Sequence, residues 1–167
     1  DVLAGAMLKY AREEAALGPV AKPRGGVSDL PTLTLLGEMF PADPMSIGRM
    51  IQPLGLNVGP TVPTREWREQ YAALDCAAVA AIHPFYTAAI REFQTAGRPV
   101  FGSAPVGRDG TAAWLERLGE LIGLPKADVE KAKQREIAAI DEALAGSRIE
   151  GRITLSGYEG SELIVAR

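Results

Sequence analysis

The chain has 167 residues, a formal net charge of −3, a hydrophobic fraction of 47% and a charged fraction of 23%. These values are typical of a soluble globular protein with one domain, or with one domain and part of another. The acidic balance argues against a nucleic-acid binder, and no apolar run reaches the roughly 18–20 residues of a membrane span. One cysteine and one histidine exclude an internal disulfide and a Cys/His metal site within one copy, and the cytoplasm is the expected compartment.

The chain opens with an amphipathic helix over residues 1–17, which Gly18 and Pro19 end. Residues 18–31 are rich in proline and glycine, so they predict a surface linker. The helix carries charged side chains on one side and apolar ones on the other, the apolar ones being Val2, Leu3, Ala6, Met7 and Tyr10.

Strands and helices alternate from residue 32 to residue 145. The strand signals are short apolar or β-branched runs, and the helix signals are 3.6-residue periods that begin at a capping residue. The expected N-caps are Asp43, Thr64 and Thr111. Pro44 follows Asp43 at the first helical position, where proline is favoured. The predicted strands are 32–36, 55–58, 76–82 and 99–101, and the predicted helices are 44–52, 65–74, 86–95, 112–122 and 128–145.

The run 76–82 is apolar, rich in small residues and without alternation, which indicates a parallel strand buried on both faces. Together with the strand–helix alternation it predicts an α/β fold around a roughly parallel sheet, with a strand order that the sequence does not give. A further strand at 152–155 opens a second unit. Because both ends read as interrupted elements, we expect a segment of a longer protein; a complete domain with helical ends is the alternative.

Ligands of parallel sheets bind beyond the carboxyl ends of the strands, and three stretches are expected there. The first follows the strand 32–36 and contains Glu38, Met39 and Phe40. Glu38 and Asp43 offer carboxylates near this edge of the sheet. The alternative is that Asp43 only caps a helix and Glu38 is a surface residue.

The second stretch is His83-Pro84-Phe85-Tyr86, directly after the strand 76–82. A lone histidine can donate a proton because its reference pKa lies near neutrality. The alternative is a histidine that caps or packs.

The third stretch, 103–111, contains Ser103, Pro105 and Gly107. Proline and glycine let the backbone approach a ligand, and the amides of the helix that follows could hold an anion. A turn followed by a helix cap at Thr111 explains the same residues. Cys76 stands at the start of a strand and is interpreted as a buried small hydrophobe.

Long runs of the sequence, including LTLLGEMFPADP, AIHPFY, SAPVG and GRITLSGYEGSELIVAR, resemble the Y-subunit family of the chlorophyllide a reductases. These enzymes are nitrogenase-like reductases of bacteriochlorophyll synthesis, and the resemblance covers about residues 1–167. It implies Rossmann-like three-layer parallel-sheet domains of the nitrogenase component-1 type. On this interpretation 1–31 is a helix and linker from the preceding domain, 32–148 is one α/β domain and 149–167 begins the next.

The resemblance also implies an assembly. Two Y and two Z subunits form the catalytic component, and an ATP-dependent iron–sulfur protein, the X subunit, delivers electrons. They pass through a [4Fe-4S] cluster to the C7=C8 bond of chlorophyllide a. The cluster ligands are expected upstream of Asp1, so no metal ligand is assigned in this segment and the isolated segment is expected to be inactive.

Site roles follow from the same resemblance. In nitrogenase a cofactor-holding cysteine occupies the position that Pro84 occupies here, which suits a flat tetrapyrrole in place of a metal cofactor. His83 and Tyr86 are the candidate proton donors, and Phe85 and Tyr86 could pack on the macrocycle. The candidate substrate-binding residues are Glu38, Met39, Phe40, Pro84, Phe85, Ser103, Pro105 and Gly107.

Three alternatives stay open at this point. The nearest is a catalytic subunit of the dark-operative protochlorophyllide reductase. A non-redox α/β binding module of the periplasmic type would need a signal peptide and a hinge, neither of which is visible. The third is a domain that only supports subunit contacts.

Overall fold

The computed structural model describes residues 1–18, 30–37, 42–83, 85–147, 152 and 154. Within these ranges the chain forms a four-stranded parallel sheet with the strand order β2-β1-β3-β4. The α/β prediction with a parallel sheet is therefore confirmed. The strands are β1 (Thr32–Leu36), β2 (Asn57–Val62), β3 (Ala78–Ala81) and β4 (Val100–Gly102).

The strand order contains a topological switch point between β1 and β3. From β1 the chain moves outward to β2, then returns across β1 to β3 and continues in the opposite direction to β4. The connections that leave β1 and β3 therefore diverge at their carboxyl ends. In open parallel sheets this is the place where ligands bind.

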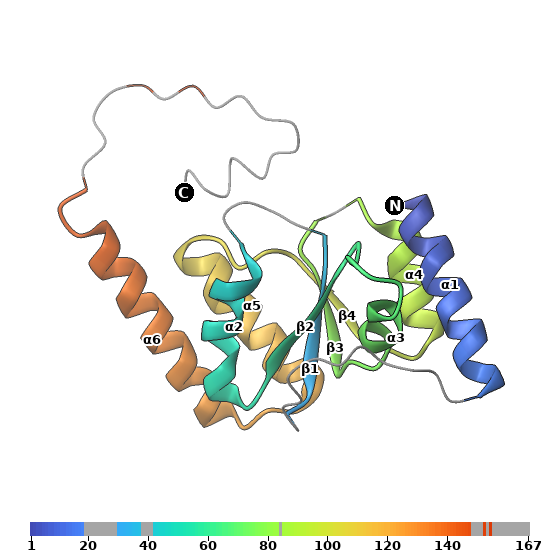
Figure 1. The fold of residues 1–167 in the computed structure, drawn as a ribbon. Helices are drawn as coiled ribbons and strands as arrows, with labels where there is room; N and C mark the ends of the chain where they lie inside the picture. The colour runs from blue at the N-terminus through green and yellow to red at the C-terminus, as the bar shows by residue number, and fades with distance from the viewer. Residues whose placement is uncertain (19–29, 38–41, 84, 148–151, 153, 155–167) are drawn as a thin grey trace.

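Helices cover both faces of the sheet, so the fold has three layers (Figure 1). One face carries α2 (Pro44–Ile51), α5 (Gly107–Ile122) and α6 (Lys126–Leu144), and the other carries α1 (Val2–Leu17), α3 (Glu69–Leu74) and α4 (Thr87–Thr95). The 3₁₀ helix η1 (Gln52–Leu54) directly follows α2 in the chain.

The core is divided by the sheet into two apolar clusters. Leu33 and Leu35 of β1 pack toward α2 and α5, whereas Leu36 packs toward α1, α3 and α4. Burial of β1 on both faces follows the pattern expected of a parallel strand between two helical layers. Thr34 is the polar exception, and its hydroxyl donates to the carbonyl oxygen of Ala73 at 3.0 Å.

Three predicted boundaries differ from the structure by four residues or more. The second strand covers 57–62 instead of 55–58, and α3 begins at Glu69 instead of 65. The expected N-cap Thr111 lies inside α5, which begins four residues earlier at Gly107, and its side chain is buried. Thr111 is therefore a core residue rather than a cap.

The buried side of α1 also differs from the predicted apolar side. Ala4, Gly5, Leu8 and Ala11 face the protein, whereas the apolar residues assigned to one side include Val2 and Leu3, which are exposed. The small residues are buried because α1 lies closely against α4 (Figure 1).

The predicted strand 152–155 lies mostly outside the described residues. Only Arg152 and Thr154 of this range are described, and both are exposed. The predicted domain boundaries at 31 and 148 stay predictions. Among the described helices, none has the length and apolar character needed to cross a membrane.

Candidate functional site

The carboxyl ends of β1 and β3 lie side by side at the switch point. Both Ile82 and His83 donate their backbone N–H groups to the carbonyl oxygen of Leu36, at 2.9 and 3.3 Å. Gly37, the next residue after β1, donates to the carbonyl oxygen of Val62 at 2.7 Å. The hydrogen bonds therefore join the ends of β1, β2 and β3 into one edge.

Gly37 makes the closest approach at this edge. Its φ is +85°, a left-handed conformation that glycine adopts without steric cost. A Cβ atom at this position would lie 2.5 Å from the Cβ of His83 and 3.0 Å from Cε2 of Tyr86. The absence of a side chain at Gly37 is what allows these two residues to sit over the end of β1.

His83, Phe85 and Tyr86, which we call the corner residues, form a compact aromatic group. The ring of His83 lies 5.2 Å from that of Phe85 and 5.8 Å from that of Tyr86, the latter edge to face. The backbone N–H of Phe85 donates to Nδ1 of His83 at 3.4 Å. With Nδ1 as the acceptor, the neutral imidazole carries its proton on Nε2.

Exposure differs among the corner residues. Phe85 is 56% exposed, whereas His83 and Tyr86 are half-buried. Tyr86 also stands at the N-cap position of α4, and its carbonyl oxygen accepts from the N–H of Ile90 at 2.9 Å. The corner thus presents one exposed aromatic ring and two polar groups held by the end of the sheet and the start of a helix.

The loop after β4 leaves the same edge, since Gly102 pairs with Ala81 at the ends of β4 and β3. Within this loop Ala104 and Val106 are buried, which anchors it to the core beneath α5. The candidate residues of this stretch alternate with these two anchors along the chain and are exposed or half-buried: Ser103, Pro105 and Gly107.

The remaining candidates are placed only in part. Glu38, Met39, Phe40 and Pro84 lie outside the described residues. Asp43 caps α2: its Oδ1 accepts from the N–H groups of Met45 and Ser46 at 2.9 and 3.0 Å, and the hydrogen bonds from Ser46 lower the pKa of the carboxyl group. The structure thus favours the helix-cap interpretation of Asp43.

Cys76 lies at the opposite edge, two residues before β3, and its side chain is buried. Burial raises the pKa of its thiol, so it stays protonated and is a poor metal ligand. The described residues contain no group of three or more His, Cys, Asp or Glu side chains that could hold a metal. This part of the chain therefore does not fit an iron–sulfur cluster, which is usually held by four thiolates.

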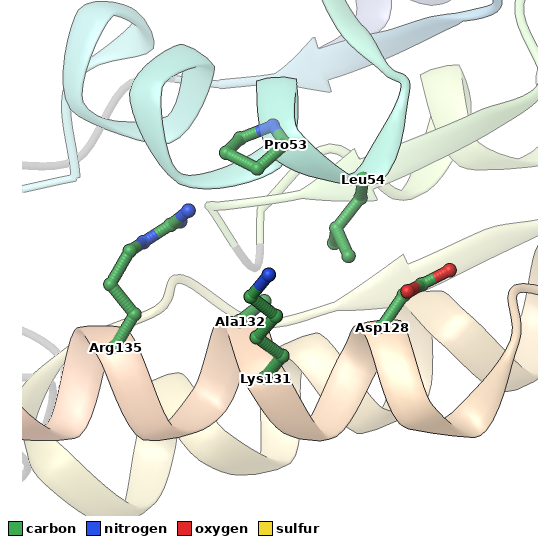
Figure 2. A pocket seen from close by; sticks show the side chains of 6 residues that line it. All are labelled: Pro53, Leu54, Asp128, Lys131, Ala132 and Arg135. Carbon is green, nitrogen blue, oxygen red and sulfur yellow. The ribbon is translucent and has the colours of Figure 1, made fainter.

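A pocket of about 230 Å³ lies away from this edge, between η1 and α6 (Figure 2). No pattern in the sequence indicates it, because its two walls are joined only in the folded chain. Arg135 at its rim is already engaged, since its Nη2 donates to the carbonyl oxygen of Met50 at 3.0 Å. The lining residues are Pro53, Leu54, Asp128, Lys131, Ala132 and Arg135.

The residues 1–167 match the family described as nitrogenase component 1 type oxidoreductase, and the chain belongs to this family. A solved structure titled "Nitrogenase Cp1 at pH 6.5" shares the fold, with a TM-score of 0.54 and 17% sequence identity over 84% of this chain and 28% of that one. At this identity the likeness supports the fold alone.

Two relatives are much more similar. They are named chlorophyllide reductase 52.5 kDa chain, and they come from Cereibacter sphaeroides, at 65% identity, and Rhodobacter capsulatus, at 62% identity. Both alignments cover 100% of this chain, and they cover 33% and 34% of the relatives. The chain thus spans about a third of the length of these relatives.

Proposed function

We propose that the chain is a segment of the Y subunit of chlorophyllide a reductase, the enzyme that reduces the C7=C8 bond of chlorophyllide a in bacteriochlorophyll synthesis. The observation that carries this proposal is the identity of 65% and 62% to two chlorophyllide reductase chains along the full 167 residues. The carboxyl edge of the sheet, with the corner residues over the end of β1, supplies a surface suited to such a substrate.

The activity belongs to an assembly of two Y and two Z subunits in the cytoplasm. The X subunit, an ATP-dependent iron–sulfur protein, supplies the electrons through a [4Fe-4S] cluster. The ligands of this cluster are expected outside the segment, because its one cysteine, Cys76, is buried at the edge opposite the corner residues. The segment alone is therefore expected to be inactive.

The corner residues are proposed to form part of one wall of the substrate site. The exposed ring of Phe85 can stack on the face of a macrocycle, because aromatic rings pack in offset or edge arrangements with other π systems. The exposed loop beside β4 would contact the edge of the ring system through Ser103, Pro105 and Gly107. The further contacts predicted at this wall are Glu38, Met39, Phe40 and Pro84.

Reduction of a carbon–carbon double bond consumes two electrons and two protons, one hydrogen ending on each carbon. His83 and Tyr86 are the proposed proton donors at this edge. His83 would transfer a proton from its doubly protonated ring. In that form Nδ1 can no longer accept the N–H of Phe85, so proton loading would change the corner itself.

His83→Ala and Tyr86→Phe in the full-length enzyme test these roles. Each is expected to lower the rate of chlorophyllide reduction by about 100-fold or more, since general acids contribute about 10²–10⁴-fold. Tyr10→Phe is the matched control, because it also removes a tyrosine hydroxyl. Tyr10 belongs to α1 and its ring packs on Trp67, away from the corner residues. Normal rates for both corner variants would contradict the proposed site.

The choice of substrate separates this proposal from its nearest alternative. The wild-type complex is expected to reduce chlorophyllide a and to leave protochlorophyllide unchanged. Reduction of protochlorophyllide instead would assign the chain to the dark-operative enzyme.

A further inference from the structure

Helix α4, which begins directly after the corner residues, has no N-terminal cap of its own. Its N-cap residue is Tyr86, whose side chain makes no capping hydrogen bond. The first amides of a helix lack partners within the helix, so they need an acceptor from elsewhere.

Asp1 supplies this acceptor from 87 residues away in the sequence. Its Oδ1 accepts from the N–H of Ala88 at 3.0 Å and from that of Ala89 at 3.4 Å, and its Oδ2 accepts from the hydroxyl of Thr87 at 3.2 Å. Asp1 stands at the N-cap position of α1, yet its side chain makes no capping bond to α1. The carboxylate of one helix therefore caps its neighbour.

The rest of the α1–α4 contact holds Asp1 in this position. A Cβ atom on Gly5 would lie 2.9 Å from the Cβ of Ala88, so the two helices approach closely at their beginnings. Further along, Arg12 forms an ion pair with Glu92 at 3.0 Å. Figure 1 shows α1 lying alongside α4, with the N-terminus near the start of α4.

From these contacts we infer that Asp1 is a positioning residue for the corner: by capping α4 it fixes Tyr86, and through Tyr86 it fixes His83, above the end of β1. The corner residues are thus positioned on two sides: by their close packing on Gly37 at the end of β1, and by the capping of α4 by Asp1. A negative charge at this place also interacts favourably with the positive end of the α4 dipole. The catalytic consequence of this role rests on the function proposed above.

The test uses full-length enzyme with Asp1→Ala, Asp1→Asn and, as a matched control, Glu92→Gln. The control removes the negative charge from the ion pair between Arg12 and Glu92, which also joins α1 and α4 but lies away from the corner. Hydrogen exchange is measured for peptides covering residues 85–92, and kcat and KM are measured for chlorophyllide a.

Asp1→Ala is expected to speed exchange of the first α4 amides about fivefold, as the loss of one N-cap implies. It is also expected to lower kcat about tenfold, because displaced catalytic groups lose rate. Asp1→Asn keeps an acceptor oxygen, so both values should return to within about twofold of the wild type. Glu92→Gln should leave kcat unchanged.

Unchanged exchange in Asp1→Ala would overturn the inference, as would a loss of kcat equal to that of Glu92→Gln. If the wild-type complex fails to reduce chlorophyllide, the proposed function fails, and the exchange of the amides still decides whether Asp1 positions the start of α4.

Discussion

At the scale of single residues, the site depends on how closely side chains can approach the end of β1. Gly37 has a left-handed backbone conformation, and the space above it is too small for a Cβ atom. Both features allow His83 and Tyr86, the two proposed proton donors, to lie directly over it. The sequence shows a glycine after a buried strand, which indicates a turn. It does not show which side chains cover that glycine, because they come from the segment between β3 and α4, far along the chain.

Gly37→Ala is expected to destabilise the subunit by about 2–4 kcal/mol, from left-handed strain and overpacking together. Its methyl group would displace His83 or Tyr86, so the rate of chlorophyllide reduction should also fall. Urea unfolding and steady-state kinetics of the full-length enzyme measure the two effects.

Gly97→Ala is the control for backbone strain alone. Gly97 has a φ of +72°, and a Cβ atom on it would meet nothing within 4 Å, so only the conformational cost of about 1 kcal/mol remains. Equal losses of stability and activity in the two variants would contradict the close contact at Gly37.

At the scale of helices and strands, local signals predicted the central elements well. β1 was predicted with its observed bounds, and Asp43 was placed as the cap of α2, because a β-rich run and an Asp-Pro pair act through neighbouring residues. The prediction for β2 was wrong at both ends, and the observed strand continues through Pro60. An edge strand tolerates a proline, since one side of the strand needs no ladder hydrogen bond.

Tertiary contacts decided the elements that were predicted less well. The start of α5 is Gly107-Arg108-Asp109-Gly110, which reads locally as a turn, yet buried Val106 and Thr111 hold it as a helix against the core. The buried side of α1 is set by its contact with α4. The sequence of α1 alone does not indicate that α4 is the helix against which it packs.

The α5–α6 pair offers a prediction at this scale. A Cβ on Gly119 would lie 2.5 Å from Cγ2 of Val129, so Gly119→Ala should separate the helices and cost about 1–3 kcal/mol. Gly110→Ala is the control in the same helix: its Cβ would meet nothing within 4 Å, and alanine should stabilise α5 by about 0.5–1 kcal/mol. Urea unfolding of the full-length subunit should show opposite signs, and a stable Gly119→Ala variant would contradict the close packing.

The cap of α2 predicts a dependence on pH. Hydrogen bonds from Ser46 and Met45 lower the pKa of Asp43 in the folded state. The stabilisation that its carboxylate gives to the folded state is therefore fully present above the unfolded pKa of about 4, and it is lost as the pH falls through the lower pKa of the folded state. The protection of the first α2 amides, which is their intrinsic exchange rate divided by the measured rate at the same pH, should therefore fall below about pH 4. In Asp43→Asn, which keeps the cap without a titrating group, this loss of protection should disappear; its persistence would assign it to another carboxyl group.

At the scale of the whole molecule, the order β2-β1-β3-β4 is what brings the carboxyl ends of β1, β3 and β4 to one edge. The sequence predicted parallel strands and located the candidate residues after them. The strand order could not be predicted, because pairing between β1 and β3 joins residues that are far apart in the chain. The same holds for Asp1 and α4, which no local pattern connects.

The most direct test of the central claim is the absorption spectrum of chlorophyllide a incubated with the assembled enzyme, the iron–sulfur partner, ATP and a reductant. The full-length subunit that contains this chain should convert the chlorin to a bacteriochlorin, whose long-wavelength band lies further to the red, and mixtures lacking that subunit should not. A complete mixture that leaves the chlorophyllide a spectrum unchanged would contradict the assignment.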